Sequence, residues 1–442
     1  MMGPRVVTKA ESLLDCGPRI VPPGLGVSQW TEFNWLRKDF LGYLEKGKAV
    51  GSEIVRLRPL PFNEIYLVTS IEVAREISGP LGHLFEKSGQ TKMMVGKFLG
   101  NGLVLSEGER HLRDRKAISK LFVKYLSNEK TAALCEVVLA GHLVHRGVSF
   151  TISDIEAFWE KISFEIIGKG IFGEIAFEES TTLFAAMNEF ADAMGMRFKS
   201  IPFPEWIPTS RNRKEKLAID KVNRALKSAY DNCNTASFAG ELKEYYKLIP
   251  GGKTQWVDQI KTLLFAGHET VAKLLSWAVY FYCSEDNLSN KIQTSLAHDG
   301  SGAVTWFVNE VLRMRPPVWL YDRAPKQDVV VGGYHIPKGK KVYISPYLYH
   351  HDQKHFDSPE KFSLGRFEDG ESSKSFIPFG EGVRSCVGKQ FALAETNSLL
   401  EWLFANYELR WSDRSNVVGI KTGATLGFDR SISIEFSKKS VK

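Results

Sequence analysis

The sequence predicts a mainly α-helical protein with a small β part, which is the α+β fold class. From about residue 107 to 285 the apolar residues recur with the period of an α-helix. Strand-like alternation is confined to two stretches, about 50–70 and 325–345. No Pro/Gly/Ser-rich stretch is long enough to mark a domain boundary, so we expect a single domain over residues 1–442.

The individual elements follow from the same patterns. Residues 30–48 predict one amphipathic helix, and residues 257–283 predict one long helix rich in apolar side chains. Pro337 and Gly339 mark a turn between two apolar runs, which predicts a β-hairpin. The predicted strands are 53–55, 65–68 and the two hairpin runs, 329–333 and 341–344.

Composition and charge exclude several classes of protein. The chain has 442 residues, 43% of them hydrophobic and 25% charged, which is ordinary for a globular protein. The mild formal charge of +7 argues against nucleic acid and is compatible with an acidic protein partner. The N-terminus lacks an apolar run near the ~20 residues of a membrane span, so we expect a soluble, cytoplasmic protein. The five cysteines form no CxxC pair, which argues against a disulfide framework or structural zinc.

The most informative segment reads FGEGVRSCVG and is followed at once by a helical pattern. Haem iron accepts a cysteine sulfur only as thiolate, and a helix N-terminus stabilises a thiolate such as that of Cys386. Glycines permit a tight turn and a close approach to a flat macrocycle. Arg384 can pair with a carboxylate, and Phe379 can shield the sulfur from water. For any single cysteine, a buried structural role is the alternative.

These residues resemble the haem-binding signature of the cytochrome P-450 superfamily, F-x-x-G-x-R-x-C-x-G. The fixed positions are matched by Phe379, Gly382, Arg384, Cys386 and Gly388. The resemblance spans roughly residues 20 to 435 and implies the cytochrome P-450 fold. It also implies haem b as the cofactor, held between a long central helix and the helix after the cysteine, with the sulfur of Cys386 as the axial ligand of the iron.

A second motif lies midway along the predicted long helix, where an acid and an alcohol are out of place by helix propensity. Its residues are Ala266, Gly267, Glu269 and Thr270. One interpretation is a groove in which the alcohol holds dioxygen and the carboxylate passes protons through water. The alternative is that Thr270 hydrogen-bonds back to its own helix and Glu269 faces solvent. The segment resembles the family's oxygen-activation motif, A-G-x-E-T, which favours the groove.

Glu310 and Arg313 resemble the family's E-x-x-R pair, which a later arginine joins. Arg366 matches that arginine, although Leu364 stands where the family usually has proline. The resemblance implies a structural triad, a buried charge network that locks the segment feeding the cysteine loop.

The carboxylates of a haem require cations. His111 and Arg115, at i and i+4 on one helix face, resemble the family's helix that reaches the haem propionates, and Arg323 resembles the other propionate arginine. Many members carry tryptophan at the position of His111, and a solvated cation is the alternative for each residue. Three histidines in a segment similar to the family's H-x-D-P loop are expected to be structural or solvated: His350, His351 and His355.

The pocket for a substrate is expected to be dry, which favours an apolar small molecule, by analogy a terpene or a fatty acid. By resemblance the pocket wall includes residues 93–99 and the start of the 266–270 segment. Each part of this wall is equally compatible with plain core. The remaining candidates are Val318, Trp319, Leu320, Thr425 and Leu426.

The resemblance implies a haem-thiolate monooxygenase that uses dioxygen and two electrons, which come from NAD(P)H through a ferredoxin or flavodoxin-type partner. A peroxide-driven peroxygenase, an isomerase and a haem sensor remain alternatives, although none of them needs the acid–alcohol pair. The helix of His111 also carries a stripe of basic residues. This stripe is either a solvated surface or the surface on which the electron donor docks. The stripe consists of Arg113, Lys116, Lys120 and Lys124.

Overall fold

The computed structural model describes most of the chain. The described residues are 20–60, 63–173, 181–198, 206–285, 287–298, 301–368, 374–411 and 418–440. Contacts between residues divide the chain into two compact units. The first consists of Met1–Met93, Val318–Glu360 and Ser373–Cys386, and the second consists of Met94–Pro317, Lys361–Ser372 and Val387–Lys442. A single domain over the whole chain stays a prediction.

The first unit is built around a five-stranded sheet in the order β1-β2-β8-β5-β3. Neighbouring strands are antiparallel, except that β2 and β8 are parallel. The strands are β1 Ile54–Leu60, β2 Asn63–Val68, β3 Phe85–Glu86, β5 Tyr321–Pro325 and β8 Lys341–Ile344, with a separate pair β6 Val329–Val331 and β7 Tyr334–Ile336. The helices are α1 Gln29–Lys38, α2 Phe40–Lys48, α3 Ile71–Ser78 and α15 Pro346–His350, with 3-10 turns η2 Gly82–Leu84 and η5 Gly382–Arg384.

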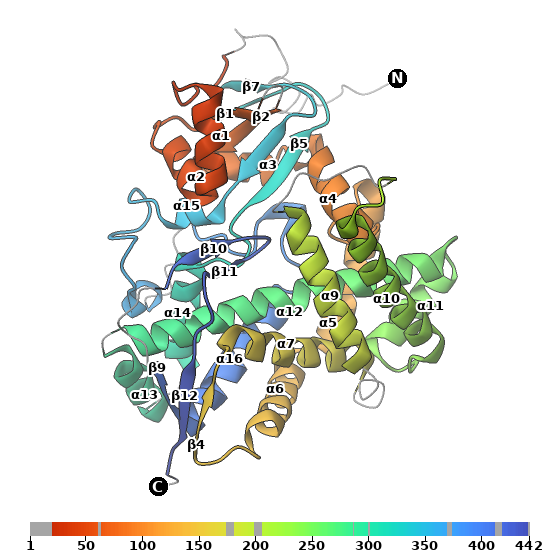
Figure 1. The fold of residues 1–442 in the computed structure, drawn as a ribbon, viewed down its shortest axis with the longest axis vertical. Helices are drawn as coiled ribbons and strands as arrows, with labels where there is room; N and C mark the ends of the chain where they lie inside the picture. Colours follow the sequence, from red (N-terminus) through yellow and green to blue (C-terminus); the bar gives the residue numbers. More distant parts are fainter. Residues whose placement is uncertain are drawn as a thin grey trace, which may run out of the picture. The chain divides into compact units, whose positions relative to one another are not determined.

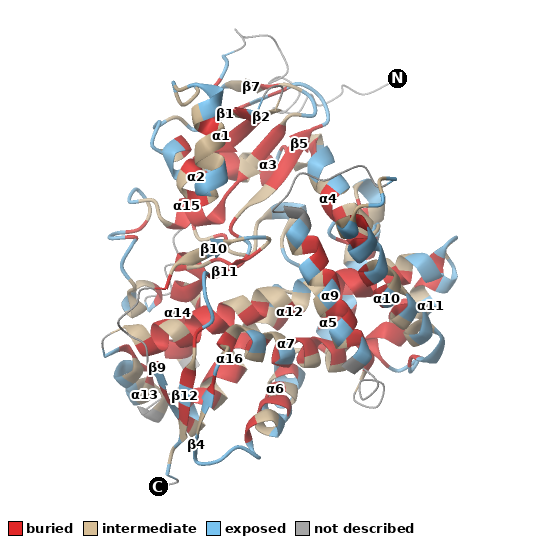
Figure 2. Cartoon of the chain, viewed as in Figure 1, coloured by how far each residue is buried: buried red, intermediate tan, exposed pale blue. Residues whose placement is uncertain are grey.

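One face of this sheet packs against α3. The buried residues of the sheet strands are red in Figure 2. Ile54 and Val68 from the first two strands meet Ala74 and Ile77 of α3 in one apolar core. Removing such side chains from water is the main term that stabilises the unit. The β-rich regions predicted near 50–70 and 325–345 are therefore confirmed.

Two local predictions in the first unit are wrong. The predicted helix 30–48 is two helices, because Asp39 takes an extended backbone (φ −152°) and its side chain caps α2 at Gly42. The predicted hairpin pairs differently. Gly332 and Gly333 both have positive φ and form the turn, so β6 pairs with β7, and β8 joins the large sheet.

The second unit is mostly helical and contains the long helix α12, Gly252–Ser284. The helices that belong wholly to this unit are α5 Gly108–Tyr125, α6 Asn128–Leu143, α7 Ile155–Phe172, α9 Thr181–Phe198, α10 Ser210–Asn232, α11 Phe238–Lys247, α13 Leu288–His298, α14 Ser301–Met314 and α16 Lys389–Asn406. Helix α4, Gly89–Leu99, enters it at Met94. The strands are β4 Ser149–Ile152, β9 Tyr407–Trp411, β10 Ile420–Thr422, β11 Leu426–Phe428 and β12 Ile434–Lys438, and η4 is Leu364–Phe367.

Helix α12 lies along α7 and is buried for most of its length, as Figures 1 and 2 show. The long apolar helix predicted for 257–283 is thus confirmed, and it begins five residues earlier (257 − 252). The β10–β11 hairpin is held against α12, because Trp277 Nε1 donates to Leu426 O at 3.1 Å and the Trp277 and Phe428 rings lie 4.4 Å apart. Among the described residues, no helix combines the length and apolarity that crossing a membrane requires.

Candidate functional site

The segment 377–386, here called the Cys loop, turns sharply before Cys386. Gly380 and Gly382 have φ of 65° and 67°, a region that favours glycine. A Cβ atom at Gly382 would lie 2.0 Å from the carbonyl oxygen of Ser78 at the end of α3. The loop closes when Cys386 N donates to Phe379 O at 2.9 Å. Glycine at position 382 is therefore required by both backbone angle and space.

The loop presents Cys386 on an accessible surface. Cys386 is exposed, whereas Cys135, Cys233 and Cys283 are buried. One pocket of the first unit is lined by both Arg323 and Arg384. Glu86 also lines this pocket. Guanidinium groups such as these two are suited to pair with carboxylates, which a haem carries. The residues present in this unit therefore fit the predicted prosthetic group.

Two side chains anchor the Cys loop, and no sequence signal points to the first of them. Arg75 of α3 pairs with Glu381, with Nη2 2.9 Å from Oε1, and the same Nη2 donates to Lys374 O. His350 is fully buried, and its Nε2 accepts from Ile377 N at 3.0 Å. His350 therefore has the structural role expected for it. Among the described residues, no cluster of His, Cys, Asp and Glu could hold a metal ion.

The middle of α12 interrupts its buried surface. Ala266 is exposed, and Gly267, Glu269 and Thr270 are half-buried, although the four residues from Lys261 to Leu264 are buried. Thr270 Oγ1 donates to Ala266 O at 2.8 Å. This hydrogen bond back to its own helix is the alternative interpretation of Thr270. His268 points into the core, where its Nδ1 lies 2.7 Å from Leu264 O and burial lowers the pKa of the ring.

Glu269 does not simply face solvent. Its Oε1 accepts a 2.7 Å hydrogen bond from the hydroxyl of Thr425, in the turn of the β10–β11 hairpin. One helical turn later, Lys273 pairs with Glu160 at 2.9 Å and with Glu156 at 3.2 Å, both from α7. Burial lowers the pKa of Lys273, but the nearby carboxylates outweigh it, so the net shift is upward and Lys273 stays charged. The acid thus lies beside an ion cluster that the sequence did not indicate.

The predicted triad is assembled within the second unit. Arg313 Nε and Nη2 donate to the two carboxylate oxygens of Glu310 at 2.8 and 2.9 Å, and both side chains are fully buried. Arg366 Nε lies 3.2 Å from Glu310 Oε1, and Ser363 N donates to the same oxygen at 2.9 Å. One buried carboxylate therefore ties α14 to the segment that carries Arg366.

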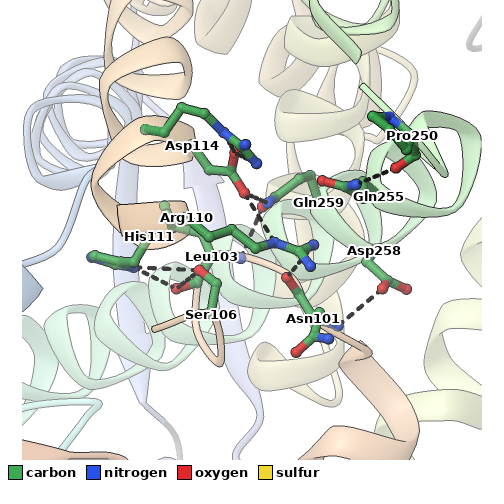
Figure 3. A network of polar contacts seen from close by, with 11 residues as sticks. Asn101, Leu103, Ser106, Arg110, His111, Asp114, Pro250, Gln255, Asp258 and Gln259 are labelled. Atoms are coloured by element: carbon green, nitrogen blue, oxygen red, sulfur yellow. Dashed lines mark hydrogen bonds and ion pairs between the residues drawn. The ribbon is translucent and has the colours of Figure 1, made fainter. Parts of the chain in front are cut away.

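His111 and Arg115 lie on α5, which a polar network fixes to α12 (Figure 3). Gln259 of α12 donates to Asp114 at 3.1 Å and accepts from Leu103 N at 2.8 Å. His111 is buried, with Nδ1 3.2 Å from Leu103 O. This network sets where α5 lies relative to the Glu269–Thr270 turn within the second unit.

The candidate pocket residues differ in exposure. Val318 is exposed, Leu320 is half-buried, and Trp319 is buried with its ring 5.4 Å from Phe40. Thr425 and Leu426 are buried in the hairpin turn that contacts α12. The placement of these five residues in a substrate pocket stays a prediction.

Comparison with solved structures supports the fold. The crystal structure of the cytochrome P450DA heme domain superposes with a TM-score of 0.79 at 16% identity, covering 96% of this chain and 98% of the other. At that identity the likeness concerns the fold alone.

Curated relatives are similar over most of this chain. The protein LUTEIN DEFICIENT 5, chloroplastic, from Arabidopsis thaliana is 26% identical over 77% of this chain and 65% of its own length. Cytochrome P450 97B2, chloroplastic, from Glycine max is 26% identical over 83% of this chain and 78% of its own. Cytokinin hydroxylase from Arabidopsis thaliana is 24% identical over 78% of this chain and 73% of its own length. The chain spans just under two thirds of the first of these.

The model of the Cytochrome P450 family matches residues 23–428, which include the Cys loop, the acid–alcohol turn and the triad. This match covers far more than half of the sequence, and the fold agrees with it. The chain belongs to the cytochrome P450 family, a family of haem-thiolate monooxygenases.

Proposed function

We propose that this protein hydroxylates or epoxidises an apolar small molecule. Each cycle consumes one dioxygen, two electrons and two protons; one oxygen atom enters the substrate and the other leaves as water. The observation that carries the proposal is the Glu269–Thr270 pair on the open turn of an otherwise buried helix. Carriers and sensors of haem need no such pair.

The haem, once bound, supplies the iron at which dioxygen is reduced and cleaved. Cys386 is the proposed axial ligand, because it alone among the four described cysteines is exposed. Arg323 and Arg384 would hold haem carboxylates from the first unit, and His111 and Arg115 from α5. Phe379, Gly382 and Gly388 would shape the surface around the sulfur.

Proton supply is assigned to Glu269 and Thr270. The hydroxyl of Thr425 engages Oε1 of Glu269, which fixes the carboxylate on α12 and leaves Oε2 to exchange protons with water. Lys273 stays charged beside this acid. Its side chain and that of its partner Glu160 are both partly exposed to solvent. Thr270 donates its hydroxyl proton to Ala266 O, so its oxygen keeps lone pairs that can accept a hydrogen bond from a water molecule in the groove.

The substrate class is proposed to be a terpene or a fatty acid, since a dry site favours apolar molecules. Relatives named as a cytokinin hydroxylase and as cytochrome P450 monooxygenase sphH support oxygen insertion as the reaction class. We keep the cytoplasm as the proposed location, although two relatives carry chloroplastic names.

The electron donor is proposed to be a ferredoxin or flavodoxin-type protein that docks on α5. Arg113 pairs with Asp114 and Lys124 with Glu241, so these two charges are already engaged. Lys116 and Lys120 are exposed, and no ion pair to either is found within the described ranges. Steps of four residues also place exposed Leu112 on this face. The charges of Lys116 and Lys120 complement those of an acidic protein surface, and Leu112 beside them offers an apolar side chain for contact.

The test is a screen of terpenes and fatty acids for compounds that move the haem iron from low to high spin. We expect each such compound to be oxidised only when dioxygen, NAD(P)H and a donor system are all present. Product formed with hydrogen peroxide alone, at the full rate and without dioxygen, would instead establish a peroxygenase.

A further inference from the structure

Besides buried His350, the Cys loop is anchored by the charged side chain of Arg75 of α3. Its Nε lies 3.1 and 3.0 Å from the two carboxylate oxygens of Glu381, and its Nη2 lies 2.9 Å from Oε1. The same Nη2 donates to the carbonyl oxygen of Lys374. One guanidinium group therefore binds two separate points of the segment that leads to Cys386.

The loop needs such an anchor because its own backbone is permissive. Gly380 and Gly382 both have positive φ, and glycine loses more conformational freedom on ordering than any other residue. The loop backbone also approaches Ser78 O so closely that no side chain fits at position 382. A small displacement of α3 or of the loop would therefore change the direction in which Cys386 points.

The contact is stronger than an ordinary surface ion pair. The fork of an arginine on a carboxylate fixes geometry as well as charge, and the additional bond to the carbonyl of Lys374 uses a further N–H of Nη2. About one third of each side chain is exposed, so solvent screens the pair only in part. Position 381 is also variable in the haem-binding signature, so the pair is a feature of this chain rather than of the signature.

We infer that Arg75 is a positioning residue for the thiolate ligand. By tying Lys374 and Glu381 to α3, it holds the Cys loop in the conformation that presents the sulfur of Cys386. The inference rests on the proposed function, because it takes Cys386 as the ligand of the haem iron. Arg75 acts on the haem only through the loop.

The experiment measures how long the thiolate bond survives in the holoenzyme. Reduced, carbon monoxide-bound protein is held in mild urea, and the red-shifted absorption band of the thiolate-ligated form is followed as it converts to the band of a form without thiolate. We expect Arg75→Ala and Glu381→Gln to accelerate this conversion roughly tenfold, the lower end of the effect of losing a charge-assisted hydrogen bond, because solvent screens the pair in part. Arg75→Lys keeps the charge without the fork and should lie between Arg75→Ala and wild type.

The matched control is Lys340→Ala. Lys340 pairs with Glu64 at 3.0 Å in the same unit, with side chains about as exposed as those of Arg75 and Glu381. Circular dichroism of each variant monitors the fold. The double variant Arg75→Glu/Glu381→Arg should recover only part of the lost lifetime, because it restores the ion pair but cannot donate to the carbonyl oxygen of Lys374. Equal lifetimes for Arg75→Ala and Lys340→Ala, or no recovery in the double variant, would overturn the inference. A wild-type protein without the red-shifted band would instead refute the proposed function.

Discussion

Thr425 donates a 2.7 Å hydrogen bond to Glu269, and this bond joins the β10–β11 hairpin to the acid of the oxygen-activation turn. The two residues are 156 positions apart in the chain. The turn that carries Thr425 was expected to line the substrate pocket. Its hydroxyl therefore links a candidate substrate-contacting turn to the candidate proton donor.

Replacing Thr425 should disturb proton supply. In Thr425→Val the carboxylate of Glu269 loses a charge-assisted hydrogen bond, which is worth about 1.5–3 kcal/mol. We expect the fraction of consumed dioxygen released as hydrogen peroxide to rise severalfold, measured with an oxygen electrode and a peroxide assay. Thr425→Ser retains the hydroxyl and should stay near wild type. Equal peroxide release from the Val and Ser variants would show that the hydroxyl plays no part.

The triad should carry a large share of the stability of the second unit. Glu310→Ala leaves fully buried Arg313 without its carboxylate partner, and such a loss costs about 3–5 kcal/mol. Urea denaturation followed by circular dichroism should show a much lower midpoint. Arg366 is partly exposed, so Arg366→Ala should cost clearly less. A wild-type midpoint for Glu310→Ala would contradict the assigned structural role.

Glu395, which the sequence did not single out, should make stability depend on pH. It is fully buried on α16, and burial raises its pKa well above the ordinary value of 4.5, an effect that the Ser163 hydroxyl offsets only in part. Above pH 4.5 the unfolded chain releases this proton while the folded chain keeps it, so stability falls as pH rises toward the folded pKa.

Glu395→Gln removes that dependence. Its advantage in unfolding free energy over wild type should grow with pH by up to ~1.4 kcal/mol per unit. Urea titrations at several pH values measure this difference, and Glu136→Gln, an exposed position on α6, is the control. A difference between Glu395→Gln and wild type that is constant with pH would mean that Glu395 is ionised in the fold.

Docking of the electron donor is tested by charge reversal. Lys116→Glu/Lys120→Glu should slow reduction of the haem by an acidic ferredoxin about tenfold at low salt, and added salt should shrink the effect. Stopped-flow absorbance measures the rate. Lys214→Glu/Lys216→Glu, on exposed positions of α10, makes the same change in net charge elsewhere. Equal slowing by both pairs would assign the effect to net charge rather than to α5.

Motifs with a local physical reason could be predicted from the sequence. The glycines around Cys386 and the Glu310–Arg313 pair are separated by short spacings, so their chemistry is visible in the residue order. Contacts between distant segments could not be predicted, because no spacing connects Arg75 to Glu381 or Thr425 to Glu269. The wrong pairing predicted for the hairpin near Pro337 has the same origin. Turn residues reveal that the chain reverses direction, but they do not reveal which strand β6 or β8 pairs with.

The central claim is that Cys386 binds haem iron as a thiolate. The absorption spectrum of the reduced, carbon monoxide-bound protein tests this directly, with Cys386→Ser as the control. We predict a strongly red-shifted main band in the wild type and its loss in the variant. A band typical of histidine-ligated haem in the wild type, or a red-shifted band that survives in Cys386→Ser, would contradict the account.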